Sequence, residues 1–257
     1  MRTTVTVRQA HKDGNDPGEY EDAWRVSGTA EGGPARVTLA DGATMSFLAG
    51  RWARMLTSAF AAAEPAVTED ADAFARTAAA VAGQWPGELE EYVAGREAAA
   101  NPLRWYERPG LERGGYATLL AVAVGPGGTW TAAAVGDTCL FQVRENRLLT
   151  AFPLTEASAF GDTPPLVGSN DTAPDGIAPL VALARGTVAP GDRLYAATDA
   201  LAAWFLSRHE GGGRPWQVLD DLSEAFFETW LAEAREKDEI HNDDVTLVSI
   251  SFGEGAV

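Results

Sequence analysis

Short apolar runs separated by glycine-rich turns constrain the fold of this chain more than any other feature. The runs are residues 23–28 (AWRVSG), 35–40 (ARVTLA), 117–125 (ATLLAVAVG), 129–135 (TWTAAAV), 139–144 (CLFQVR), 193–197 (RLYAA) and 245–252 (VTLVSISF). The segments GTAEGGPA, GPGG and REN connect neighbouring runs as hairpins. The pattern therefore predicts a system of antiparallel strands.

Apolar residues at helical spacing occupy four other segments. These are residues 44–63, 69–99 with a break at Pro86-Gly87, 200–208 and 216–236. Helices grouped outside runs of strands predict an α+β layered architecture. Residues 151–190 are rich in proline, and we expect a long, functional loop with little regular structure there. With no internal repeat or linker in the sequence, we predict one domain over residues 1–257.

Composition excludes several classes of function. A formal net charge of −17 and the lack of a basic run argue against nucleic acid as a partner, because such binding depends on Lys and Arg neutralising phosphates. The first residues lack the apolar region of a secretory signal, and the longest apolar run, 117–125, is too short to cross a bilayer. The one cysteine, Cys139, is predicted to be a buried thiol. We predict a cytoplasmic protein without a membrane partner.

Aspartates stand where the predicted strands begin or end. They are Asp22, Asp41, Asp137, Asp199 and Asp243. In antiparallel neighbours the end of one strand lies beside the start of the next, so these carboxylates can share one edge. Asp22 and Asp41 are equally far from the predicted turn centre at Glu31-Gly32. Each aspartate alone also fits the ordinary role of a cap or turn former.

Carboxylates gathered at one edge would repel one another and raise each other's pKa unless a cation lay between them. No Lys or Arg is adjacent in sequence to these aspartates. Oxygen-only clusters suit hard cations such as Mg²⁺ or Mn²⁺, whereas zinc prefers His or Cys, and the chain has three His and no HExxH spacing. Two such ions could activate a water for attack on phosphorus.

Six motifs together resemble the metal-dependent protein serine/threonine phosphatases of the PP2C type (PPM), in their bacterial branch. The motifs are EYEDAW (19–24), VTLADG (37–42), GGYATLL (114–120), AAAVGDTCLFQV (132–143), GDRLYAATDALAAWF (191–205) and NDDVTLVSI (242–250). The resemblance spans nearly the whole chain. It implies a four-layer α-β-β-α sandwich of two antiparallel sheets flanked by helices, with a two-metal centre at one end.

The same resemblance implies a role for each aspartate. Asp41 would bridge two Mg²⁺ or Mn²⁺ ions, and the carbonyl of Gly42 would bind one of them. Asp199 and Asp243 would bind the second ion, while Asp22 would contact a metal-bound water. The implied catalytic residues are therefore Asp41, Asp199 and Asp243.

The first two kinds of departure from the family pattern concern the metal ligands and the proton donor. Asp137 resembles the acidic residue of a weak third metal site, but alanines and a leucine follow Asp199, so this site loses an expected ligand. Ala43-Thr44 follows Gly42 without a histidine, which leaves a metal-bound water or His241 as the general acid. Asp244 stands where the family has Asn, so either it or Asp243 could be the ligand.

A third departure concerns phosphate binding. The family's phosphate-binding Arg is missing before the first acidic motif, and Pro17 occupies roughly its place. Lys12 or His11 could substitute, although Lys binds phosphate without the bidentate fork of Arg. Both also fit the role of exposed loop residues.

We therefore expect a metal-dependent phosphatase that hydrolyses phosphoserine or phosphothreonine on cytoplasmic proteins and opposes a kinase. The loop-rich segment 151–190 would correspond to the family's variable flap near the active site. Two alternatives stay open: a pseudophosphatase that acts as a binding module, and a hydrolase of a small phosphorylated metabolite.

Overall fold

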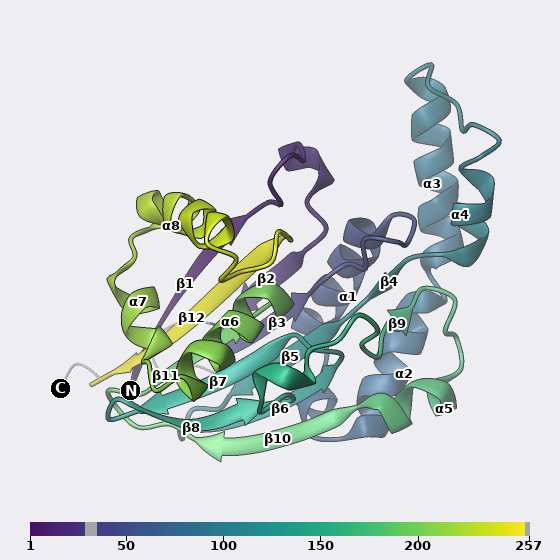
Figure 1. Cartoon of the computed structure of the whole chain (residues 1–257). Coiled ribbons are helices and arrows are strands. Elements are labelled where there is room, and N and C mark those ends of the chain that lie inside the picture. Colours follow the sequence, from purple (N-terminus) through teal and green to yellow (C-terminus); the bar gives the residue numbers. More distant parts are fainter. Residues whose placement is uncertain (29–34, 255–257) are drawn as a thin grey trace.

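Two five-stranded antiparallel sheets form the centre of the molecule in the computed structural model, which describes residues 1–28 and 35–254. Sheet A has the order β1 (Arg2–Ala10), β12 (Val245–Gly253), β11 (Arg193–Ala197), β7 (Cys139–Arg144) and β8 (Arg147–Phe152). Sheet B has the order β10 (Ala182–Thr187), β6 (Thr129–Val135), β5 (Leu119–Val124), β3 (Ala35–Ala40) and β2 (Ala23–Ser27). A short pair, β4 (Tyr116–Ala117) and β9 (Val167–Gly168), lies beside them (Figure 1).

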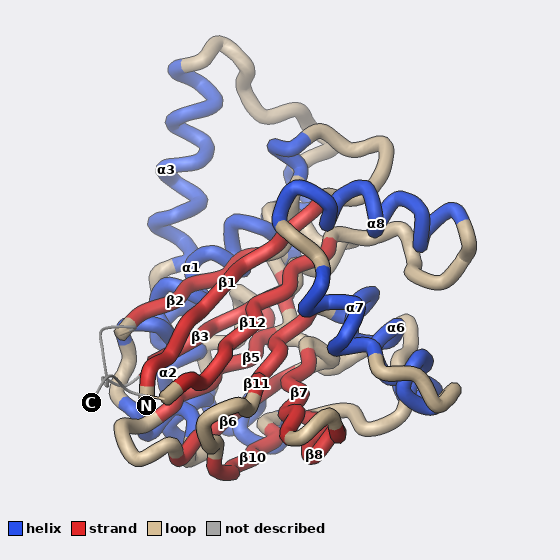
Figure 2. Tube along the Cα trace, turned by 90° about the vertical axis from the view of Figure 1, so that its left-hand side faces the viewer, coloured by secondary structure: helices blue, strands red, loops and turns tan. Residues whose placement is uncertain are grey.

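Helices cover both outer faces of the sheets (Figure 2). The α-helices are α1 (Ala49–Ala62), α2 (Ala71–Ala82), α3 (Trp85–Ala98), α4 (Arg108–Arg113), α5 (Pro174–Ile177), α6 (Asp199–Glu210), α7 (Pro215–Asp221) and α8 (Glu224–Glu236). Short 3-10 helices are η1 (Pro17–Glu19), η2 (Pro65–Thr68), η3 (Ala157–Ala159) and η4 (Ala178–Leu180). The α1–α2 pair lies on sheet B, and α6, α7 and α8 lie on sheet A (Figure 2).

Three apolar clusters hold the four layers together. The cluster between the sheets includes Leu39, Leu120, Val248 and Ile250. The cluster between sheet B and its helices includes Trp52, Phe60 and Phe74. The cluster between sheet A and its helices includes Phe141, Phe205 and Leu231. Burial of these large side chains supplies most of the driving force for folding. The predicted α+β sandwich of two antiparallel sheets flanked by helices is confirmed.

Several strands were missing from the predicted runs, among them the edge strands β1 and β10. β1 has no place among the predicted runs, and β10 lies inside the segment 151–190, which was expected to be a loop. Both are edge strands whose side chains alternate between exposed and only partly buried positions. A weakly buried edge strand carries few apolar residues, so its alternation is hard to distinguish from a loop. The expectation of little regular structure over 151–190 was wrong for β10, β9 and α5.

Helix boundaries also differ from the predicted ones. The break expected at Pro86-Gly87 falls earlier, between α2 and α3, because a proline in the first turn of a helix sacrifices no hydrogen bond. The predicted helix 44–63 begins only at Ala49, and the predicted helix 216–236 is two helices, α7 and α8. The predicted turn centre at Glu31-Gly32 lies outside the described residues.

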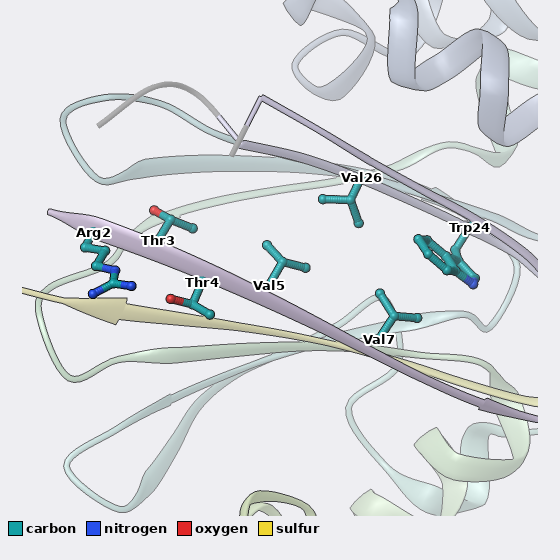
Figure 3. Close-up of a pocket in the computed structure, with 7 residues that line it drawn as sticks. All are labelled: Arg2, Thr3, Thr4, Val5, Val7, Trp24 and Val26. Atoms are coloured by element: carbon teal, nitrogen blue, oxygen red, sulfur yellow. The ribbon is translucent and has the colours of Figure 1, made fainter. Parts of the chain in front are cut away.

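The strand register brings two of the predicted aspartates to the same end of the sandwich. Ala23 pairs with Ala40, so Asp22 and Asp41 follow on directly at the same end of β2 and β3. Away from that end, a groove runs between the edge strands β1 and β2, where Val5 and Val7 face Trp24 and Val26 (Figure 3). Within residues 1–28 and 35–254, no helix combines the length and apolar character needed to cross a membrane.

Candidate functional site

A cleft of about 640 Å³ opens at the end of the sandwich where β3 and β11 finish and β12 starts. Asp41, Asp137, Asp199 and Asp243 line it together with Gly42 and His241. Both sheets contribute, since Asp41 and Asp137 follow strands of sheet B and Asp199 follows a strand of sheet A. The structure therefore brings together the strand-end aspartates that the sequence had placed on one edge.

Backbone hydrogen bonds and close packing fix the Asp41–Gly42 corner. Thr118 donates its backbone N–H to the Asp41 carbonyl at 2.9 Å, and the Asp41 N–H donates to Thr118 Oγ1 at 3.2 Å. A side chain at Gly42 has no room, because a Cβ there would lie 2.8 Å from the carbonyl oxygen of Glu21 and from the backbone of Ala49. The backbone that carries the Asp41 carboxylate is consequently rigid.

Threonines connect this corner to Asp137. The hydroxyls of Thr118 and Thr138 are 2.6 Å apart, which joins the end of β3 to the turn after β6. Gly136 has a φ of +101°, a value that favours glycine, and a Cβ there would overlap Thr118. The turn holds Asp137 against the cleft with only 6% of its surface exposed.

Sheet A supplies the opposite wall. Asp199 is the first residue of α6, and its Oδ1 accepts the N–H of Ala200 at 2.5 Å. Asp243 precedes β12, and its Oδ1 lies 3.5 Å from Lys12 Nζ. Arg235 of α8 donates to the Asp243 carbonyl oxygen at 2.5 Å and thereby fixes the approach to β12.

Asp22 lies behind the cleft and links the two sheets. Its Oδ2 accepts hydrogen bonds from Thr246 Oγ1 at 2.7 Å, Thr198 Oγ1 at 3.2 Å and the Tyr20 hydroxyl at 3.3 Å. Its Oδ1 is buried and has no hydrogen-bond partner among the described residues. Sequence reasoning missed Tyr20, Thr198 and Thr246, because their partner is known only after β2, β11 and β12 have been brought together.

Asp243 and Asp244 have different environments. Asp244 is buried and is not among the residues that line the cleft. Its Oδ1 accepts the N–H of Lys12 at 2.9 Å, and its Oδ2 accepts the N–H of Glu21 at 2.6 Å. Asp243 lines the cleft. The choice left open between these two neighbours therefore falls on Asp243 as the residue available to a ligand.

Burial and mutual repulsion raise the pKa values of Asp41, Asp137 and Asp199. Burial is the larger cause for Asp41, followed by repulsion from Asp22 and Asp199. Burial, then repulsion from Asp243, raises the pKa of Asp199, and burial with repulsion from Asp199 raises the pKa of Asp137 to about 7. In the part of the chain that the structure describes, Lys12 is the one basic side chain that forms an ion pair with any of the aspartates that line the cleft. Negative charge at the cleft therefore exceeds the positive charge that the chain supplies.

The donor atoms around the cleft suit a hard divalent cation. They are the carboxylate oxygens of the aspartates that line the cleft beside Gly42, and the Oδ1 of Asp22 behind them is buried without a hydrogen-bond partner among the described residues. Over residues 1–28 and 35–254, no three His, Cys, Asp or Glu side chains surround a single point as ligands of one ion. The arrangement fits Mg²⁺ or Mn²⁺ held through one or two carboxylates with water completing the shell, which is how Mg²⁺ is usually bound.

The three candidates for phosphate binding and proton transfer have different positions. His241 lines the cleft and is exposed. Lys12 sits beside the cleft through its contact with Asp243 and is absent from its lining. His11 also is not among the lining residues, and its Nδ1 lies 3.3 Å from the Lys12 carbonyl oxygen.

No protein-family model and no curated protein matches this sequence. Solved structures do match over nearly the full length. The serine/threonine phosphatase PstP/Ppp of Mycobacterium tuberculosis has a TM-score of 0.61 and 16% identity, covering 99% of this chain and 100% of that chain. A bacterial serine phosphatase has a TM-score of 0.62 and 13% identity, covering 98% of this chain and 99% of that chain. The photosystem II phosphatase PBCP has a TM-score of 0.58 and 15% identity, covering 97% and 98%.

The chain has the PP2C-type fold. Within this fold, residues 161–166 of the proline-rich segment form one rim of the carboxylate cleft. The segment predicted to be a flap thus reaches the cleft, although its later part joins sheet B as β10.

Proposed function

We propose that this protein is a Mg²⁺- or Mn²⁺-dependent phosphatase that hydrolyses phosphoserine and phosphothreonine on proteins. The observation that carries the proposal is the cleft of aspartates whose charge the chain itself does not balance, at the end of a PP2C-type sandwich. Further support comes from the similar catalytic domain of PstP, which was solved in complex with two manganese ions and is 17% identical to this chain.

Asp41, Asp199 and Asp243 would hold two ions, with the Gly42 carbonyl as an additional ligand. Bound ions supply a Lewis acid and a water of lowered pKa at neutral pH. Asp22 would orient a water through its free Oδ1, because three hydroxyl donors already fix its Oδ2. A weak third ion at Asp137 belongs to the same proposal.

Other side chains would handle the phosphate and the proton. His241 would donate a proton from its imidazole to the leaving oxygen of the serine or threonine, and its position in the lining of the cleft supports this role. Lys12 is the phosphate-binding candidate at the rim. Its ammonium group would give up the ion pair with Asp243 and pair with the phosphate instead. His11 is the weaker candidate, because its ring faces the Lys12 backbone.

A two-substrate assay tests the proposal. Purified protein with Mn²⁺ is expected to hydrolyse p-nitrophenyl phosphate and a phosphothreonine peptide, and Asp199→Ala is expected to abolish both. Asp175→Ala, at an exposed aspartate of α5 outside the cleft, is the matched control and should retain activity. Binding of Mn²⁺ by calorimetry without turnover would indicate a pseudophosphatase instead. Turnover of the aryl phosphate alone would indicate a metabolite hydrolase.

The cellular setting follows from the proposed substrate. A phosphorylated protein requires a kinase that makes it, so a partner kinase of the serine/threonine class is part of the proposal. The cytoplasm is the proposed location, because the composition has one buried cysteine and no strongly apolar segment.

A further inference from the structure

Helices α3 and α4, with the loop between them, form an arm that projects beyond the sandwich (Figures 1 and 2). We call residues 85–113 the arm. Trp85, at the start of α3, is the one fully buried residue of that helix. A helix with polar residues on nearly every side gains little from core burial, so its protrusion needs another explanation.

The arm is braced at its base and along its length. The ring of Tyr92 lies edge-on to Phe47 with 6.0 Å between centroids, and Arg51 lies over the same ring at 5.3 Å. Arg96 donates to both carboxylate oxygens of Glu107, at 3.0 and 3.3 Å, which ties α3 to the residues before α4. These contacts hold the loop at the tip in one shape, and a preformed surface binds a partner at a lower entropic cost.

Large aromatic side chains are exposed on the loop between α3 and α4, residues 99–107, which we call the tip of the arm. Trp105 is 82% exposed and Tyr106 is 59% exposed, and the two rings meet edge-to-face with centroids 5.9 Å apart. Exposed tryptophan and tyrosine held in place are characteristic of contact surfaces between proteins. The folded chain covers neither ring with its own described residues, so the pair is available to a partner.

The tip and the cleft belong to one continuous surface. Met45 lines the cleft and is 95% exposed, and two residues later Phe47 packs against Gly110 of α4. Trp105 is five residues before Gly110, so it lies at most about 18 Å from that contact. From Met45 the span to the aromatic pair is at most about 25 Å, so a polypeptide bound in the cleft needs about seven or eight further extended residues to reach it.

Charge at the tip differs from charge on the chain as a whole. Arg104 precedes the aromatic pair and Arg108 is the first residue of α4; both are exposed, and neither forms an ion pair with a described residue. Glu107 is engaged by Arg96, which leaves Glu112 as the one unpaired acid between residues 104 and 113. The positive excess is confined to the segment around Trp105 and Tyr106, because glutamates outnumber arginine in the neighbouring helix α3. Such a local excess in a protein of net charge −17 selects an acidic partner segment.

We propose that the tip of the arm docks an acidic segment of the phosphorylated protein substrate, about five to ten residues away from the phosphoresidue in the cleft. Trp105 and Tyr106 would supply apolar contact, and Arg104 and Arg108 would pair with the acidic side chains. The proposal rests on the proposed phosphatase activity and adds a substrate class to it: proteins with an acidic stretch near the phosphorylation site.

Two matched phosphothreonine peptides test this docking surface. One carries four glutamates five to ten residues from the phosphothreonine on each side, and the other carries lysines at the same positions. Trp105→Ala/Tyr106→Ala and Arg104→Glu/Arg108→Glu are each expected to raise KM for the acidic peptide at least fivefold with kcat unchanged. Charge reversal should also lower KM for the lysine peptide. The control variant is Phe226→Ala, at an exposed aromatic residue of α8.

Hydrolysis of p-nitrophenyl phosphate separates docking from catalysis. It should be unchanged in both arm variants, because this substrate is too small to reach the tip. Equal KM values for the acidic peptide in wild type and both arm variants would overturn the proposal, as would a parallel loss of aryl phosphate activity.

If the wild type hydrolyses neither substrate, the proposed function fails. Binding of the acidic peptide, carrying a fluorescent label, then tests docking at the arm by itself. Binding weakened in the arm variants alone would support docking, and equal binding in all variants would overturn it.

Discussion

Strand β11 has a buried or half-buried aspartate at each end, and the two ends are built differently. Before the strand, Asp192 accepts hydrogen bonds from Arg144 at 2.6 Å, from Gln142 at 3.1 Å and from the Ala189 N–H at 3.0 Å. Burial would raise the pKa of Asp192, but these bonds outweigh burial and lower it. After the strand, burial and repulsion from Asp243 raise the pKa of Asp199.

The difference shows how one fold treats carboxylates for stability and for function. Asp192 has a complete set of protein donors, so its charge stabilises the folded chain. Asp199 has the Ala200 N–H and no basic partner among the described residues, so its charge opposes folding until a cation is supplied. Such an incomplete carboxylate is what a metal-binding site requires, because a paired carboxylate would have to break its ion pair first.

The largest expected effect is on activity at the cleft end of β11. Asp199→Asn should lower kcat/KM for an aryl phosphate with Mn²⁺ by more than about 100-fold, beyond the usual loss for residues outside the ligand shell. Its free energy of unfolding in EDTA should stay equal or rise at pH 8, since an unpaired charge is removed. Steady-state kinetics and urea unfolding measure the two quantities. A clear loss of stability without loss of activity would show that Asp199 stabilises the fold, as is argued for Asp192, and does not act in catalysis.

The next largest effect is on stability, at the end of β11 that carries Asp192. Arg144→Met should lower the free energy of unfolding by about 2–3 kcal/mol, because it leaves the Asp192 carboxylate buried with too few donors. The value lies below that of a fully buried pair because 34% of the Arg144 side chain is exposed. Activity per folded molecule should be unchanged. Urea denaturation at pH 7 measures the difference, and a change under 0.5 kcal/mol, roughly that of an ordinary surface substitution, would contradict it.

The pH dependence of stability should have opposite signs at the two ends. In EDTA, Asp41, Asp137 and Asp199 have raised pKa values and hold protons in the folded state that the unfolded state has already released. Stability therefore falls as pH rises from about 4 towards the Asp137 pKa of about 7. We expect a loss of about 2 kcal/mol between pH 5 and 7. Asp192 acts in the opposite sense, since its contribution is present above about pH 4 and is lost at lower pH as the folded group protonates.

Mn²⁺ should cancel the loss of stability between pH 5 and 7, because a cation favours the charged carboxylates. Saturation at about 100 times Kd adds roughly 2.7 kcal/mol. Thermal melting with Mn²⁺ or EDTA across this pH range measures the effect. Identical profiles in both conditions would argue against an ion at the cleft.

The smallest effect concerns Asp244. Asp244→Asn should lower the free energy of unfolding by about 1 kcal/mol, because an amide oxygen replaces only one of the two acceptors that bind the N–H groups of Lys12 and Glu21. Mn²⁺ affinity, measured by calorimetry, should change less than for Asp243→Asn. The reverse order would make Asp244 the ligand.

Much of the fold was predictable, because most of its strands have a recognisable apolar pattern in their own local sequence. The runs 129–135 and 139–144 agree with β6 and β7 almost to the residue, since buried central strands need nearly continuous apolar sequence. The edge strands β1 and β10 were missed, as their half-exposed side chains carry a weaker pattern. A helix break was expected at Pro86-Gly87, whereas Pro86 lies in the first turn of α3 and the break falls just before that helix, between Ala82 and Trp85.

At the cleft, the sequence by itself determined which residues are candidates: aspartates stand at strand ends, and antiparallel pairing places such ends together. Tertiary structure alone decided what surrounds them. It gave Asp22 two hydroxyl donors from distant segments, Thr198 and Thr246, and buried Asp244 outside the cleft lining. The physical reason is range, because hairpin register is a local property, whereas burial, charge and hydrogen-bond partners depend on segments up to more than 200 residues apart that meet only in the folded chain.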